Sequence, residues 1–291
     1  MMLLPWRRMG KSKMEYAAIY RMGAERLQQA GIEEALLDAR LLLEAACGTD
    51  QNTLLAHGNQ TVTEQQKECY VNYIEQRSRH VPLQHITGYQ EFMGLRFQVS
   101  PAVLIPRQDT ETLVEEVMRF LHDGMHILDL CTGSGCILLS LLRYSNDCVG
   151  VGSDLSENAL LAAKENASLL GLEAEFVCSD LFEKIEGKYE IIVSNPPYIR
   201  SSDIPGLMEE VRDHDPMMAL DGGEDGLSFY RKIIVSAGDY LYPGGMLFFE
   251  IGSDQAQEVA GYMSKAGYRD IAICKDLAGL DRVVYGRFVG W

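Results

Sequence analysis

Apolar residues in the first 80 positions recur at the spacing of amphipathic helices. The stripes consist of Tyr16, Ile19, Tyr20 and Leu27, and then of Leu36, Ala39, Leu42, Leu43 and Ala46. Residues three and four apart share one face of a helix, so each stripe predicts a helix that buries one side. Gly48 ends the second stripe, and Thr61-Val62-Thr63-Glu64 fits a capping box that opens a third helix. We therefore predict a small helical domain over residues 14–80.

The stretches on either side of this domain have a different character. Residues 1–13 place four basic side chains after a few apolar ones, the reverse of a secretory signal, so we expect a disordered tail. Residues 81–106 combine β-prone segments with Gly88, Gly94 and Pro101, a pattern typical of a hairpin. We predict that this segment is an interdomain hairpin linker and that residues 107–291 form a second domain.

Strand and helix patterns alternate through this second domain. Asp109 or Thr110 is predicted to cap a helix that runs to Leu121, which leaves Arg107 free to face a pocket. Short apolar runs predict strands at 125–130, 148–153, 173–178, 189–193, 245–251, 271–274 and 282–288. No helix-length segment separates the last two runs, so we expect them to pair antiparallel. The alternation predicts an α/β fold with a mixed seven-stranded sheet.

Four of these strands end in polar loops. The residues of interest at or near these strand ends are Asp129, Gly133, Asp154, Asp180 and Asn195. In an open α/β sheet the carboxyl ends of parallel strands meet at one edge, so we expect these residues to converge. The glycine-rich turn Cys131-Thr132-Gly133-Ser134-Gly135 lets the backbone approach a ligand, and Asp154 is placed to accept from both hydroxyls of a ribose. For Asp154 and Asp180, a helix cap or a solvated loop is the alternative.

The stretch Ser194-Asn195-Pro196-Pro197-Tyr198 is the predicted reaction centre. Two consecutive prolines make a stiff corner, since each fixes its own φ and extends the residue before it. Such a corner can hold the Asn195 side-chain oxygen and the Pro196 carbonyl as fixed acceptors, with the Tyr198 ring as a wall beside them. Two acceptors and an aromatic face suit a planar NH2 group. The alternative is an ordinary turn, because Asn-Pro is common in turns.

Composition and charge narrow the classes of partner. The 291 residues are 47% hydrophobic and 23% charged, without an apolar run near the ~18 residues of a membrane span. A net charge of −16 disfavours nucleic acid as a bulk partner, although a local basic patch stays open. Seven cysteines without a Cys-x-x-Cys pair fit a reducing cytoplasm. Gly124 interrupts any helix joining His122 and His126, so we expect no metal site.

Five stretches together resemble the release factor glutamine methyltransferase family of class I, Rossmann-like, S-adenosylmethionine-dependent enzymes. They are residues 88–97, 104–111, 129–135, 194–198 and 275–286, the last with Asp281-Arg282-Val283. The resemblance implies S-adenosylmethionine as cofactor, with its ribose on Asp154 and its adenine near Asp180 and Leu181. The implied cofactor contacts are Asp129, Cys131, Thr132, Gly133, Ser134, Gly135, Asp154, Asp180, Leu181 and Asn195. Cys131 stands where the family usually has glycine, Gln108 where proline is common, and Leu181 where some members have an aromatic residue.

The resemblance also implies the reaction. Asn195, Pro196, Pro197 and Tyr198 would bind the glutamine of a Gly-Gly-Gln motif in peptide-chain release factors, and its side-chain amide nitrogen (N5) would be methylated. Because all proposed contacts follow residue 128 and the helical domain carries no chemical motif, we also predict that residues 14–80 recognise the protein substrate. An exocyclic-amine methyltransferase acting on nucleic acid is the alternative that shares the Asn-Pro-Pro-Tyr corner. A dinucleotide oxidoreductase would need a third glycine where Leu138 stands, and a non-catalytic domain would bind the methyl donor without turnover.

Overall fold

The computed structural model describes residues 14–290 and divides them into two compact units after Thr87. The expected tail over residues 1–13 lies outside the described residues. The division falls within the segment 81–106 that we expected as a linker. Each unit has a hydrophobic core made of its own residues, one within residues 14–86 and the others after residue 91. Among the helices of the described chain, none is long and apolar enough to cross a membrane.

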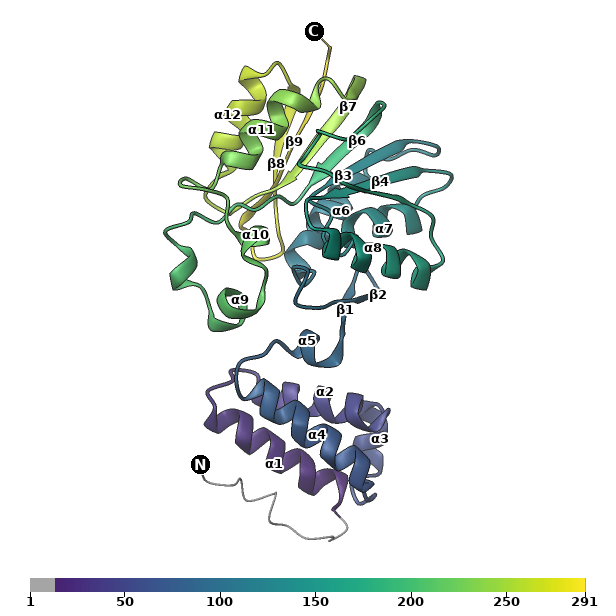
Figure 1. The fold of residues 1–291 in the computed structure, drawn as a ribbon, viewed down its shortest axis with the longest axis vertical. Helices are drawn as coiled ribbons and strands as arrows, with labels where there is room; N and C mark the ends of the chain where they lie inside the picture. Colours follow the sequence, from purple (N-terminus) through teal and green to yellow (C-terminus); the bar gives the residue numbers. More distant parts are fainter. Residues whose placement is uncertain (1–13, 291) are drawn as a thin grey trace. The chain divides into compact units, whose positions relative to one another are not determined.

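The first unit is helical (Figure 1). Its helices are α1 (Tyr16–Gln29), α2 (Ala35–Cys47), α3 (Gln51–Ala56), α4 (Glu64–Arg77) and α5 (Leu83–Thr87). Leu27, Leu42 and Ile74 are fully buried between them, as the predicted stripes required. The expected capping box is displaced by two residues. Thr63 caps α4 and exchanges hydrogen bonds with Gln66, because the chain up to Val62 is still extended and bonds to Met14.

The second unit begins with a hairpin of β1 (Tyr89–Phe92) and β2 (Leu95–Gln98). Phe92 and Phe97 are buried in the same core as helices of this unit, with their rings edge to face at 6.1 Å. Asn166 accepts from the backbone N–H of Gln98 at 2.7 Å and donates to its carbonyl at 3.1 Å. These contacts anchor the hairpin within the second unit.

A mixed seven-stranded sheet forms the centre of this unit, which confirms the predicted fold class. Its strands are β3 (His126–Leu130), β4 (Val149–Asp154), β5 (Glu175–Cys178), β6 (Tyr189–Ser194), β7 (Leu241–Glu250), β8 (Arg269–Lys275) and β9 (Asp281–Arg287). The order is β5-β4-β3-β6-β7-β9-β8, in which the first five strands are parallel. β8 and β9 are antiparallel, as their close spacing predicted.

Helices cover both faces of the sheet (Figure 1). Alternate strand residues such as Ile191 and Val193 face α6 (Glu111–Met118), α7 (Cys136–Arg143) and α8 (Glu157–Leu170). Ile192 and its counterparts face α11 (Ser228–Ala237) and α12 (Ala256–Lys265). A long segment between β6 and α11, residues 195–227, contains η3 (Ile204–Gly206), α9 (Glu209–His214) and α10 (Met217–Leu220). We call this segment the excursion.

The structure differs from two predictions for the segment before α6. A short 3-10 helix, η2 (Gln108–Thr110), precedes α6, so Thr110 lies at the predicted N-cap position but has helical backbone angles and makes no side-chain cap bond. Its hydroxyl is directed to the Asn195 side chain instead. Arg107 is paired with Asp215, its guanidinium 2.5 Å from the carboxylate, because the excursion before α11 folds back to this segment.

Candidate active site

The register of the parallel strands brings the predicted polar residues into one row. Leu130 of β3 lies opposite Ser153 of β4 and Ser194 of β6, and Asp154 lies opposite Cys178 of β5. The next residues along each chain, among them Cys131 and Asn195, therefore emerge at the same edge. β3 has its sequential neighbour β4 on one side and β6 on the other, and such a switch point is where open α/β sheets bind ligands.

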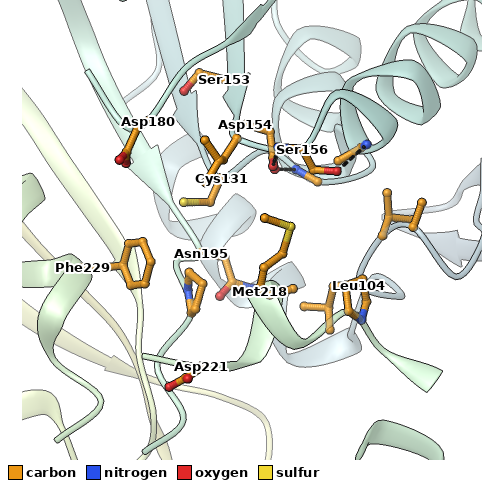
Figure 2. Close-up of a pocket in the computed structure, with 18 of the residues that line it drawn as sticks. Leu104, Cys131, Ser153, Asp154, Ser156, Asp180, Asn195, Met218, Asp221 and Phe229 are labelled. Atoms are coloured by element: carbon orange, nitrogen blue, oxygen red, sulfur yellow. Dashed lines mark hydrogen bonds between the residues drawn. The ribbon is translucent and has the colours of Figure 1, made fainter. Parts of the chain in front are cut away.

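A cavity of about 510 Å³ occupies this edge (Figure 2). Seven of the predicted site residues line it, namely Cys131, Gly133, Asp154, Asp180, Leu181, Asn195 and Pro197. Figure 2 shows Cys131 and Asp154 on one side of the cavity and Asn195 across from them. The structure therefore brings together residues about 65 positions apart in the chain, as the sequence predicted.

The Asp154 carboxylate braces the glycine-rich turn. One of its oxygens accepts from the backbone N–H of Gly133 and the other from that of Ser156, both at 2.9 Å. Gly133 has a φ of 56°, and a Cβ there would meet nothing within 4 Å, so the turn leaves open space beside the carboxylate. Cys131 adopts a φ of 60°, the left-handed region that favours glycine, which explains the glycine usual at this position. Burial raises the pKa of Asp154.

The remaining residues of the turn and Asp129 are buried around the site and do not line the cavity. Thr132 donates to the Asp129 carboxylate at 2.6 Å, and the Ser134 carbonyl accepts from Asn166 at 3.0 Å. A Cβ on Gly135 would lie 3.2 Å from that of Ala163, so this glycine allows α7 and α8 to approach. Burial raises the pKa of Asp129 to about 7.

We expect the raised pKa of Asp129 to affect stability. The folded protein retains a proton that the unfolded chain releases, so this stabilisation is complete below the unfolded pKa of about 4 and is lost as pH rises through about 7. The free energy of unfolding should therefore fall across this window by a few kcal/mol. In Asp129→Asn, urea unfolding at several pH values should show a shallower fall. The exposed control Asp123→Asn should keep the wild-type slope, and an unchanged slope in Asp129→Asn would contradict the assignment.

The Asn-Pro-Pro-Tyr corner is held in place by contacts with residues that do not line the cavity. The Tyr198 hydroxyl donates to Glu250 at 3.3 Å, and the Tyr198 carbonyl accepts from the Gln255 amide at 2.9 Å. A Cβ on Gly222 would lie 2.7 Å from the Cα of Tyr198, so the returning excursion packs directly on the corner. Pro196 and Tyr198 lie in the corner and do not line the cavity described above.

Sequence reasoning missed several residues that line the cavity. They are Ala102, Val103, Leu104, Ser153, Leu155, Ser156, Ala159, Ser179, Pro216, Met217, Met218, Ala219, Asp221 and Phe229. Leu104 lies in one of the stretches that resemble the family, which was a usable signal. Ser153, Ser156 and Ser179 lie at or just after the ends of β4 and β5, so the predicted strands could have identified them as cavity residues. For Met218 and Phe229, the sequence has no comparable signal, since the excursion that carries Met218 has no regular periodicity.

Comparison with known proteins places this architecture in a class. The family model described as methyltransferase small domain matches residues 108–211, and the model described as PrmC N-terminal domain matches residues 18–88. A crystal structure of a methyltransferase from Pyrococcus furiosus has the same fold, with a TM-score of 0.53 at 20% identity over 68% of this chain and 90% of that one. Sheet order, site position and these matches define a class I methyltransferase.

Curated relatives define the family. A protein of Geobacter sulfurreducens named release factor glutamine methyltransferase is 41% identical, covering 90% of this chain and 92% of its own length. A protein of the same name from Clostridium acetobutylicum is 42% identical, covering 89% of this chain and 93% of its own length. The chain belongs to the release factor glutamine methyltransferase family, which confirms the resemblance noted in the sequence.

Proposed function

We propose that this protein transfers a methyl group from S-adenosylmethionine to the side-chain amide nitrogen of the glutamine in the Gly-Gly-Gln motif of peptide-chain release factors. The observation that carries the proposal is the Asn195 side chain at a cavity whose other side is formed by the Gly133 turn and Asp154. The relatives described above are named release factor glutamine methyltransferase, which supports the proposed substrate class. The seven cysteines are all free, which supports a reducing cytoplasm as the place of reaction.

The cavity fits the proposed cofactor. Gly133 leaves open space at the turn, and the carboxylates of Asp154 and Asp180 line the adjoining wall. We assign Asp154 to the ribose hydroxyls and the region of Asp180 and Leu181 to the adenine. Asp129, Thr132, Ser134 and Gly135 support the turn from behind. The bound sulfonium would supply an already activated methyl group, so no covalent nucleophile on the protein is required.

The corner residues orient the substrate amide. An amide nitrogen is a poor nucleophile because its lone pair is delocalised into the carbonyl. In our proposal the Asn195 side-chain oxygen and the Pro196 carbonyl accept from the NH2 group, which fixes its plane and favours electron density on nitrogen. Pro197 and Tyr198 keep the corner rigid, and we propose that they form the wall against which the substrate side chain lies. Positioning of this kind can contribute roughly 7–11 kcal/mol. As the nitrogen–carbon bond forms, the carbon–sulfur bond of the methyl donor would break and the neutral thioether S-adenosylhomocysteine would leave. The methylated nitrogen would then be acidic and would lose its proton to solvent.

An incorporation assay separates this function from its alternatives. Protein, labelled S-adenosylmethionine and either a release factor, DNA or RNA would be incubated, and label in each polymer measured. We expect label in the release factor. Labelling restricted to nucleic acid would support the exocyclic-amine alternative, against which the net charge of −16 argues. Binding of the methyl donor without labelling of any polymer would indicate a non-catalytic domain.

Asp154→Ala should weaken cofactor binding. The substitution removes acceptors for the ribose and also the bonds that hold the Gly133 turn. A charge-assisted hydrogen bond contributes roughly 1.5–3 kcal/mol, so the dissociation constant of S-adenosylmethionine should rise at least about tenfold. Calorimetry measures this directly, with Asp123→Ala at the opposite end of the sheet as the control. An unchanged constant in a variant with native circular dichroism would move the ribose elsewhere.

We also propose that the helical unit serves recognition of the protein substrate. The residues assigned to chemistry all follow residue 128, and the two units have separate cores. Removing residues 1–87 should leave cofactor affinity nearly unchanged and raise the KM for intact release factor, with less effect on a short Gly-Gly-Gln peptide. Steady-state kinetics with both substrates tests this. A folded truncated protein with an unaltered KM for the intact factor would exclude the recognition role.

A further inference from the structure

The Asn195 carboxamide has a buried partner that the proposed chemistry does not use. Its nitrogen Nδ2 donates to the hydroxyl oxygen of Thr110 at 3.4 Å. Thr110 is 2% exposed and comes from η2, far away in the sequence. A carboxamide has a donor end and an acceptor end of nearly equal size, so the groups around it decide which end faces the cavity.

The Thr110 hydroxyl is in turn next to a carboxyl group. Glu250, the last residue of β7, is 2% exposed, and its carboxyl interacts with the Thr110 side chain. An ionised carboxylate can only accept hydrogen bonds, and a hydroxyl has one proton to donate. The Glu250 oxygen Oε2 is buried without a hydrogen-bond partner among the described residues, so it is the acceptor to which we assign the Thr110 proton. The lone pairs of the hydroxyl then remain for the Asn195 Nδ2 group. This arrangement leaves the Asn195 oxygen free as an acceptor.

We propose that Thr110 and Glu250 are positioning residues that hold the Asn195 side-chain oxygen, rather than its nitrogen, toward the substrate amide. The inference rests on the proposed function, because it explains how the acceptor needed for a substrate NH2 group is selected. Without the Thr110 hydroxyl, the Asn195 carboxamide could rotate by half a turn. It would then present its own NH2 group, a donor, to the NH2 group of the substrate, which is also a donor. Turnover would then fall, although the cofactor side of the cavity would be unchanged.

The charge state of Glu250 controls the direction of this chain of hydrogen bonds. Several titratable or charged groups face it from the surrounding elements, namely Asp109, Cys136, Tyr198, Tyr230 and Arg282. Arg282, itself paired with Asp276 at 3.0 Å, favours the ionised carboxylate, whereas burial raises the pKa of Glu250 to about 7. A protonated Glu250 can donate to Thr110, which can then donate to the Asn195 oxygen. The maximal rate should therefore rise with pH through about 7.

Substitutions at Thr110 test the first link. Thr110→Val keeps the shape and removes the hydroxyl, so kcat on a Gly-Gly-Gln peptide should fall about tenfold or more. The dissociation constant of S-adenosylmethionine should change less than about twofold. Thr110→Ser restores the hydroxyl and should recover most of the rate, and Thr112→Val on α6 is the matched control. A Thr110→Val enzyme with wild-type kcat, or a Thr110→Ser enzyme as impaired as Thr110→Val, would overturn the proposal.

The pH profile of Glu250→Gln tests the second link. Wild-type kcat, measured at saturating cofactor and peptide, should show a rise near neutral pH that Glu250→Gln lacks. If Asp129 caused the rise, Glu250→Gln would retain it and the proposal would fail. The failure of the proposed function has a different signature, since the wild-type enzyme would then not methylate the peptide at any pH.

Discussion

Replacing Asn195 by alanine should reduce methyl transfer to the glutamine amide by about two to three orders of magnitude. Removal of one preorganised hydrogen-bonding group from a transition-state site has effects of this size in other enzymes. Asn195 lies at the cavity across from Asp154, and its carboxamide is oriented by a bond to Thr110. Alanine would leave the Pro196 carbonyl as the one acceptor of the proposed pair, so the substrate NH2 group would no longer be fixed in its plane.

The same variant should bind the cofactor almost normally. The lost oxygen is assigned to the substrate, while the residues assigned to the ribose and the turn are unchanged. Turnover and calorimetric affinity for S-adenosylmethionine should both be measured, with the exposed Asn146→Ala as the matched control. Near-normal turnover in Asn195→Ala would contradict the assignment of this corner as the reaction centre. Loss of cofactor affinity together with turnover would assign Asn195 to the cofactor instead.

Gly222→Ala should disable the enzyme by displacing the corner rather than by removing a functional group. The added Cβ would lie 2.7 Å from the Tyr198 Cα and 2.8 Å from the Pro197 carbonyl oxygen, distances that backbone atoms do not tolerate. The chain returning to α11 is held there by a bond from the Gly222 N–H to the Ile199 carbonyl at 2.8 Å. Overpacking of this kind costs typically about 1–3 kcal/mol.

We expect turnover of Gly222→Ala to fall at least about tenfold, because small misplacements of reacting groups have large kinetic effects. The control is Gly206→Ala in the same excursion, where a Cβ would meet nothing within 4 Å. Thermal unfolding and steady-state kinetics of both variants give the comparison. Equal activity and equal unfolding temperature in the two variants would show that the corner is not confined by Gly222.

The sequence was sufficient for the architecture because the relevant signals are local. Apolar runs, turn residues and helix periodicity predicted the seven strands and the antiparallel final pair. The rule that parallel strands end at one edge then placed Cys131, Asp154 and Asn195 together, and the register confirms it. These inferences need strand direction and order of secondary structure, and they do not need side-chain geometry.

Other features depend on contacts between distant segments and could not be read from local patterns. Threonine is a residue type favoured at helix caps, yet the hydroxyl of Thr110 faces the side chain of Asn195, 85 positions further along the chain. The sequence predicted that Arg107 is free to face a pocket, but in the structure Arg107 forms an ion pair with Asp215 of the excursion. Phe229 lines the cavity from the start of α11, where one apolar residue of an amphipathic helix cannot be distinguished from the others. Tertiary packing determines each of these roles.

The most direct measurement of the central claim is tandem mass spectrometry of a release factor incubated with the protein and S-adenosylmethionine. The account predicts one added methyl group on the glutamine of the Gly-Gly-Gln motif, with fragment ions that locate it on the side-chain amide. The Asn195→Ala protein should leave that peptide unmodified under the same conditions. A methyl group on any other residue, or an unmodified Gly-Gly-Gln peptide in the presence of active wild-type protein, would contradict the account.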